Sequence, residues 1–136
     1  MEQKRDTRFP KESLRLLVEG KLDWEEVKKA IRLHPKDEDR FWKYLSVLQE
    51  RVSWKDKILL RISDHLYIVA KDGGGRVVKC DCGQEFGDYR INWKLSCRIR
   101  VRRTAEEMSE VVTVEEAVPN PDLVQIREYY CPGCYA

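Results

Sequence analysis

The sequence predicts an α+β protein, in which an N-terminal helical segment of about three helices precedes a small antiparallel β lobe. Apolar residues recur with helical spacing in the first fifty residues, segments rich in Ile, Leu, Val and Tyr follow residue 54, and all five cysteines lie after residue 79. A chain of 136 residues can bury a core. We therefore expect a helical lobe at residues 1–53 and a β-rich lobe at residues 54–136, packed together as one compact unit.

The first two helices are predicted from the residues at their ends. Pro10 opens the first helix, and Gly20 lies where a left-handed C-terminal cap belongs. Asp23 is the expected N-cap of the second helix, where Glu26 completes a capping box and Pro35 ends the helix.

The second and third helices each carry an apolar stripe that we interpret as core packing. In the second helix the stripe consists of Trp24, Val27, Ala30 and Ile31. The third helix is expected to start at Asp37 or Glu38. Its apolar residues follow the i, i+3, i+4, i+7 rule at Phe41, Tyr44, Leu45, Leu48 and Val52.

The β part is expected to begin with an antiparallel hairpin. Residues 57–62 and 66–70 have strand composition, and the three glycines at 73–75 form a turn that accepts positive φ before Val77. These glycines lack the spacing of a phosphate-binding loop, and no helix signal follows them. A turn is therefore the better interpretation.

Residues 94–103 alternate as a strand with one apolar and one basic face. The apolar face carries Cys97, Ile99 and Val101, and the basic face carries Arg98, Arg100 and Arg102. Two interpretations of the arginines remain open: a solvated outer face, or a docking surface for an acidic partner. Residues 111–118 and 123–130 are expected to form two further strands, separated by a turn at residues 119–121.

Two close cysteine pairs predict a metal site. Forty-eight residues separate the pair Cys80 and Cys82 from the pair Cys131 and Cys134, and glycine or proline beside each pair permits tight turns. Four thiolates at the tips of two turns are typical of tetrahedral Zn²⁺. Such a closed shell has no open position for substrate, so we expect one structural zinc per chain.

Three details qualify the predicted metal site. The first pair is C-x-C, so its two side chains start on the same face of an extended strand and must be bent together to reach one ion. Iron in a rubredoxin-like centre would use the same four thiolates. The fifth cysteine, Cys97, could in principle substitute for a ligand, but we interpret it as a buried small apolar residue.

Several other functions are disfavoured by composition. The net charge is only +2, divided as +5 over residues 1–79 and −3 over residues 80–136, so nucleic acid is an unlikely partner. No segment is apolar enough to span a membrane, and the N-terminus does not read as a secretory signal, so a cytoplasmic location is expected. His34 and His65 are expected at the surface, and no catalytic site is predicted in this chain.

Several sequence runs, in the same order along the chain, resemble the gamma subunit of acetone carboxylase. They extend over most of the chain: Leu48-Gln49-Glu50-Arg51, Trp54-Lys55-Asp56-Lys57-Ile58, Cys80-Asp81-Cys82-Gly83, Asn92-Trp93-Lys94-Leu95-Ser96 and residues 126–134. The resemblance implies a small zinc-carrying subunit with ligands Cys80, Cys82, Cys131 and Cys134. It also implies large hydantoinase-like partner subunits that use ATP and a divalent metal to join a ketone and bicarbonate into a β-keto acid.

The sequence departs from that family in two places. It ends two residues after Cys134, and it has Cys97 where a small residue is usual. A short form of this subunit also occurs in acetophenone carboxylase, so the sequence resembles that enzyme's small subunit as well, and an aryl ketone is the preferred expectation.

Three functions were therefore compared. A carboxylase subunit would contact its partners through the three arginines and exposed aromatics such as Trp54 and Trp93. A free-standing zinc ribbon would bind single-stranded nucleic acid through the same arginine strand, or a protein partner. A rubredoxin-like electron carrier would hold iron in place of zinc.

Overall fold

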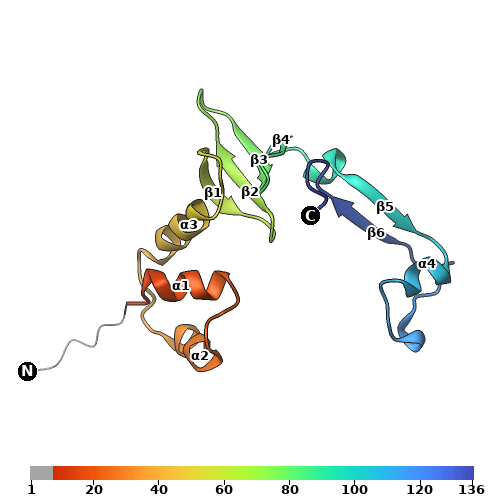
Figure 1. The fold of residues 1–136 in the computed structure, drawn as a ribbon, viewed down its shortest axis with the longest axis horizontal. Coiled ribbons are helices and arrows are strands. Elements are labelled where there is room, and N and C mark those ends of the chain that lie inside the picture. The colour runs from red at the N-terminus through yellow and green to blue at the C-terminus, as the bar shows by residue number, and fades with distance from the viewer. Residues whose placement is uncertain (1–7) are drawn as a thin grey trace, which may run out of the picture.

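The computed structural model describes residues 8–136, and its helices precede its strands along the chain. The predicted α+β class is confirmed (Figure 1). The N-terminal segment that was judged not to be a secretory signal lies mostly in residues 1–7, outside the described residues. No helix in the described part has both the length and the apolar character needed to cross a bilayer. The lobe boundary at residues 53 and 54 stays a prediction.

Three helices form the N-terminal part: α1 (Lys11–Val18), α2 (Trp24–Arg32) and α3 (Arg40–Glu50). Gly20 has the positive φ of +70° that was expected after the first helix. The Asp37 carboxylate ties the helices together, because it accepts the backbone N–H of Phe9 at 2.5 Å and pairs with Lys43 at 2.9 Å. Phe9 joins Leu14, Ala30 and Val47 in a small core between the helices.

The expected apolar stripe of α2 is only partly correct. Ala30 is buried, but the side chains of Trp24 and Ile31 are more than 60% exposed. The second helix lies at the end of the helical group (Figure 1). Only the side that carries Ala30 packs against the other helices, and the remaining apolar side chains face solvent. The capping box is also absent: Asp23 accepts the N–H of Glu25, with no reciprocal bond from Glu26.

The third helix is buried on two sides. Leu45 and Leu48 pack toward the sheet, while Val47 packs toward the other helices. A single-stripe pattern could not predict Val47, because that pattern assumes one buried face. Phe41 begins the expected stripe but is exposed, since it precedes the part of the helix that is covered.

An antiparallel four-stranded sheet follows, with neighbours in the order β1-β2-β3-β4. Its strands are β1 (Lys57–Arg61), β2 (Leu66–Ala70), β3 (Arg76–Cys80) and β4 (Glu85–Asp88). The glycine turn joins β2 to β3 as predicted, with φ near +98° at Gly73 and Gly74. The sequence did not indicate β4, since this four-residue edge strand contains two carboxylates and a glycine.

The remaining residues form an arm that extends away from the four-stranded sheet (Figure 1). Here the arm means the two-stranded ribbon of β5 (Arg98–Arg102) and β6 (Ile126–Tyr130) together with the residues between them. A 3₁₀ turn (Trp93–Ser96) precedes β5. The intervening residues contain α4 (Ala105–Ser109) and a second 3₁₀ turn (Glu115–Ala117).

The strand predicted at residues 111–118 is therefore wrong. Thr104 and Glu107 form a reciprocal capping box that starts α4, and the chain continues into a 3₁₀ turn at Glu115–Ala117. The strand predicted at 123–130 is shorter than expected, because Leu123 and Val124 lie in a turn whose N–H groups bond to the Asn120 carbonyl.

The interpretation of the arginine strand as a solvated outer face is confirmed for Arg98 and Arg100, which are exposed, and is wrong for Arg102, which is buried. Docking of the strand on an acidic partner stays a prediction. The Arg102 side chain is only 4% exposed and donates to Glu110, Glu128 and the backbone carbonyl of Glu107 at 2.6 Å each. Arg100 pairs with Glu110 at 2.7 Å, and Arg98 stacks on the Tyr135 ring. Ile99, expected on a buried face, is 52% exposed.

This arrangement predicts that acid loosens the arm. The Arg102 guanidinium lowers the pKa of both Glu110 and Glu128 below the usual value of 4.5. Their contribution to stability is therefore complete above that value and is lost as the pH falls through the lower folded-state pKa. We expect the amide protection factors in β5 and β6, corrected for the intrinsic pH dependence of exchange, to fall on acidification below about pH 4.5, and a Glu110→Gln/Glu128→Gln variant to show a flatter pH dependence.

Candidate metal centre

Two turns bring four cysteine sulfurs together between the four-stranded sheet and the base of the arm. Cys80 ends β3 and Cys82 follows it, while Cys131 and Cys134 follow β6. All four Sγ atoms lie within 4.8 Å of one another. The Sγ atoms of Cys80 and Cys134 are 3.7 Å apart, as are those of Cys82 and Cys131.

These distances fit a tetrahedral metal ion. Four sulfurs at about 2.3 Å from a central zinc are separated by about 3.8 Å, close to the two shortest observed pairs. The sulfurs are too far apart for disulfides, and all four cysteines are free. Cys80 and Cys131 are buried and the other two are exposed, so the site lies at the protein surface with one half covered.

The local backbone explains how a C-x-C pair can hold one ion. The N–H of Gly83 donates to the carbonyl of Cys80 at 2.9 Å, and Gly83 has φ of +96°. This turn bends the chain immediately after β3, so that the side chains of Cys80 and Cys82 converge. Only glycine adopts such a φ without strain.

Backbone donors favour the thiolate form of one ligand. Burial disfavours ionisation of Cys131, but the N–H groups of Cys134 and Gly133 point at its sulfur and lower its pKa. Burial is the largest influence on Cys80 and raises its pKa. A metal ion must displace the protons from these thiols, so metal affinity is expected to fall in acid.

Residues 52–136, which contain this site and both sheets, match the acetone carboxylase gamma subunit family. The chain belongs to the acetone carboxylase gamma subunit family. It is 42% identical to the acetone carboxylase gamma subunit of Xanthobacter autotrophicus, over 87% of this chain and 70% of that protein. It is 36% identical to the acetophenone carboxylase beta subunit of Aromatoleum aromaticum, over 40% of this chain and 43% of that protein. The resemblance inferred from the sequence is thereby confirmed.

In this member of the gamma subunit family, two tryptophans support the cysteine site. Trp54 donates its indole N–H to the carbonyls of Cys80 and Asp81 at 3.1 and 3.0 Å. Trp93 packs between Phe86 and Tyr129 in edge-to-face contacts. Both were expected to be exposed, and both are half-buried. Only the fold reveals these roles, since Trp54 is 26 residues from Cys80.

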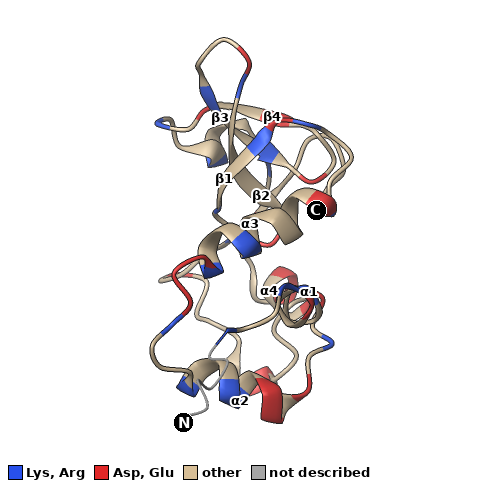
Figure 2. Cartoon of the chain, turned by 90° about the vertical axis from the view of Figure 1, so that its left-hand side faces the viewer, with Lys and Arg blue, Asp and Glu red and all other residues tan. Residues whose placement is uncertain are grey.

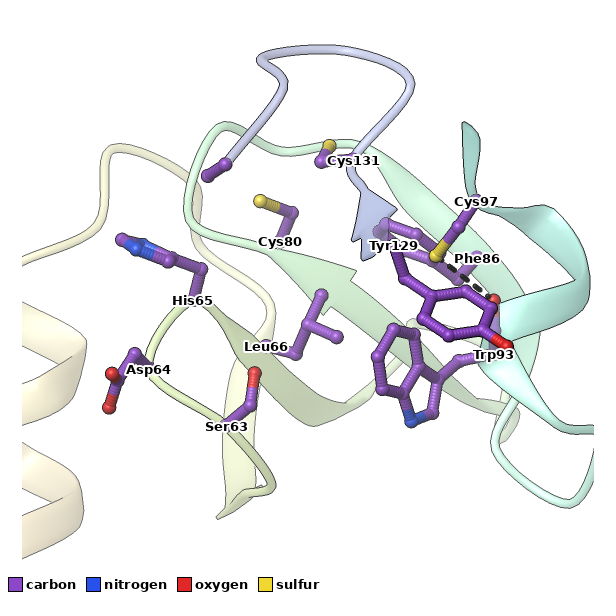
Figure 3. Close-up of a pocket in the computed structure, with 11 residues that line it drawn as sticks. Ser63, Asp64, His65, Leu66, Cys80, Phe86, Trp93, Cys97, Tyr129 and Cys131 are labelled. Atoms are coloured by element: carbon purple, nitrogen blue, oxygen red, sulfur yellow. Dashed lines mark hydrogen bonds between the residues drawn. The ribbon is translucent and has the colours of Figure 1, made fainter. Parts of the chain in front are cut away.

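A cavity of about 280 Å³ adjoins the buried half of the site. Figure 3 shows Trp93 and Tyr129 on one side of it, His65 and Ser63 on the other, and the sulfur of Cys80 at its edge. His65 is exposed, as expected, and its Nδ1 lies 2.7 Å from the carboxylate of Asp81. His34, the other histidine, is also exposed.

The fifth cysteine is separate from the metal centre. Cys97 lies outside the group of four sulfurs and contacts the carbonyl of Trp93 at 3.6 Å. It is half-buried, packs against the core beside the metal centre and lines the cavity, so the expectation of a buried apolar residue is only partly correct. The cavity beside Trp93 leaves the side chain of Cys97 partly accessible.

The tight approach at Gly133 predicts a mild metal-binding defect. A Cβ added there would lie 3.3 Å from the Cys82 sulfur and 3.2 Å from Gln84. We expect Gly133→Ala to weaken metal affinity by about 10-fold, the lower end of the effect of groups that position metal ligands, because the neighbouring side chain of Gln84 can move by a few tenths of an ångström. Competition with a chromogenic chelator measures the change. Gly75→Ala, where no atom lies within 4 Å of the added Cβ, should bind metal as the wild type does.

Proposed function

We propose that the chain is the small zinc-binding subunit of an ATP-dependent ketone carboxylase complex, with a structural role. The observation that carries this proposal is a cluster of four cysteine sulfurs within 4.8 Å of one another in a chain that is 42% identical to an acetone carboxylase gamma subunit over most of its length. Cys80, Cys82, Cys131 and Cys134 would hold the zinc ion.

The proposed role of zinc is to fix the base of the arm. The four thiolates complete the ion's coordination, so the bound ion would supply folding energy and no Lewis-acid chemistry. The buried half of the site belongs to a core that contains Cys80 and Cys131 together with Leu66, Val78 and Phe86. Metal binding and packing of this core would therefore stabilise each other.

The reaction would occur on larger, hydantoinase-like subunits in the cytoplasm. Those subunits would bind ATP and a divalent metal and join a ketone with bicarbonate into a β-keto acid. More of the chain matches the acetone enzyme's subunit than the acetophenone enzyme's subunit. This difference favours a small aliphatic ketone over the aryl ketone expected from the sequence.

The alternative of nucleic-acid binding has lost its main support. It relied on the arginine strand, whose guanidinium groups bind glutamates and Tyr135 of the same chain. Figure 2 also shows that acidic and basic residues alternate along the chain.

Purification of the tagged chain from its native host tests the proposal. We expect large carboxylase subunits, identified by mass spectrometry, to co-purify in fixed proportion, and about one zinc per chain by elemental analysis. Isolation of the chain without these subunits would contradict the carboxylase role. A coloured protein containing iron would favour the rubredoxin-like alternative instead.

A further inference from the structure

The arm has almost no core of its own. Among residues 98–130, only Arg102 and Met108 are buried. A two-stranded ribbon is at best marginally stable alone in water. Here one face of the ribbon is supported by α4 through the Arg102 contacts with Glu107 and Glu110. The far end of the arm lies well away from the helices and the four-stranded sheet (Figure 1).

The tip of the arm, defined as residues 104–125, exposes several aliphatic side chains. They are between 44% and 82% exposed: Val111, Val114, Leu123 and Val124. Clustered apolar groups at the end of a projection are typical of a surface that another protein covers.

The same tip is strongly acidic. It contains six carboxylates and no lysine or arginine. Glu107 and Glu110 are used within the arm, in the cap of α4 and the arginine contacts. The side chains of Glu106, Glu115, Glu116 and Asp122 form no ion pair with any residue in the described range 8–136.

A hollow in the tip combines these two properties. It measures about 470 Å³ and lies between α4 and residues 118–121. Glu106 and Glu115 line it together with Val118, Pro119 and Pro121. An apolar wall with unpaired carboxylates suits a lysine or arginine side chain, whose stem is apolar and whose head is cationic.

We propose that the tip docks on a large carboxylase subunit whose contact surface is apolar and rimmed with lysine or arginine, one of which enters the hollow. This inference rests on the proposed function, since it assigns the surface through which the subunit joins its complex. It also replaces the arginine strand as the contact: the arginines stiffen the arm, and the tip makes the interface. Attraction between the acidic tip and a basic partner would speed association and make it sensitive to salt.

Binding to purified large subunits, with identity established by mass spectrometry, tests the inference on the full chain. Glu106→Gln/Glu115→Gln and Leu123→Ser should each weaken binding at least ~10-fold, as expected for central interface residues. Glu38→Gln/Asp72→Asn and Ile31→Ser are matched controls, because all three residues are exposed and lie outside the arm: Glu38 in the turn before α3, Asp72 in the glycine turn and Ile31 on α2. The association rate should fall at least ~10-fold between 0.05 and 0.5 M salt.

The outcomes separate the two proposals. If the wild type binds and the tip variants bind equally well, the docking inference is overturned and the proposed function stands. If the folded wild type binds no large subunit, both the proposed function and the docking inference are wrong. If the tip variants change only self-association of this chain, the partner is a second copy and the inference is wrong.

Discussion

Replacing Cys131 with serine should abolish stoichiometric metal binding and lower the melting temperature by on the order of 10 °C or more. Cys131 is 4% exposed and contributes to the core that joins the sheet to the arm. A serine hydroxyl is a poor zinc ligand at neutral pH, so the remaining three thiolates would hold the ion weakly. Elemental analysis and thermal unfolding followed by circular dichroism measure both effects.

Cys97→Ser is the matched control for this prediction. Cys97 lines the same cavity but lies outside the group of four sulfurs. The Cys97→Ser variant should retain its full metal content, with only a small change in melting temperature. An unchanged melting curve for Cys131→Ser would contradict the structural role of the metal, and loss of metal in Cys97→Ser would show that the fifth cysteine is a ligand.

Arg102→Met should loosen the arm and leave the metal centre intact. The substitution removes a side chain that is 4% exposed and leaves Glu110 and Glu128 without their shared cation. The Glu107 carbonyl also loses its donor. The two carboxylates are 54% and 25% exposed, so water can partly solvate them, and the loss is that of several hydrogen bonds to one charged group. We expect a decrease in melting temperature of roughly 5–10 °C and faster amide exchange in β5 and β6.

Arg98→Met on the same strand provides the comparison. Arg98 is exposed and stacks on the Tyr135 ring at 5.5 Å from its centroid, so its replacement should change the melting temperature by no more than ~2 °C. If both variants melt alike, Arg102 does not hold the arm together. Metal content should remain near one ion per chain in each variant.

Much of the fold follows from local sequence signals. The turn glycines, the caps of the first helices and the alternation in β5 each depend on a few neighbouring residues, and the structure contains the corresponding elements. The cysteine cluster was also predictable, because two close cysteine pairs with glycine beside or between them are typical of a metal site. The family resemblance came from the order of short runs along the chain.

Some errors are local, such as the strand expected at residues 111–118 and the unexpected β4. The others concern which element covers a given face. Strand periodicity predicts that Arg98, Arg100 and Arg102 share a face, and it contains no information about which element covers that face. Arg102 is covered by α4 and its C-cap, where its guanidinium donates to the carbonyl of Glu107 and to the carboxylate of Glu110. Trp24 and Ile31 were misplaced for the same reason, since an apolar stripe shows that a helix can pack and does not show how much of it is covered.

The metal centre has a topological consequence for the whole arm. By linking Cys82 to Cys131, a bound ion would enclose residues 83–130 in a closed loop, as a disulfide does. Closing a loop of that length reduces the entropy of the unfolded chain by the equivalent of about 4 kcal/mol. The tip, although distant from the sulfurs, lies inside this loop. If the bound ion raises the affinity of the ordered tip for a partner, thermodynamic linkage requires that the partner raise the affinity for the metal by the same factor.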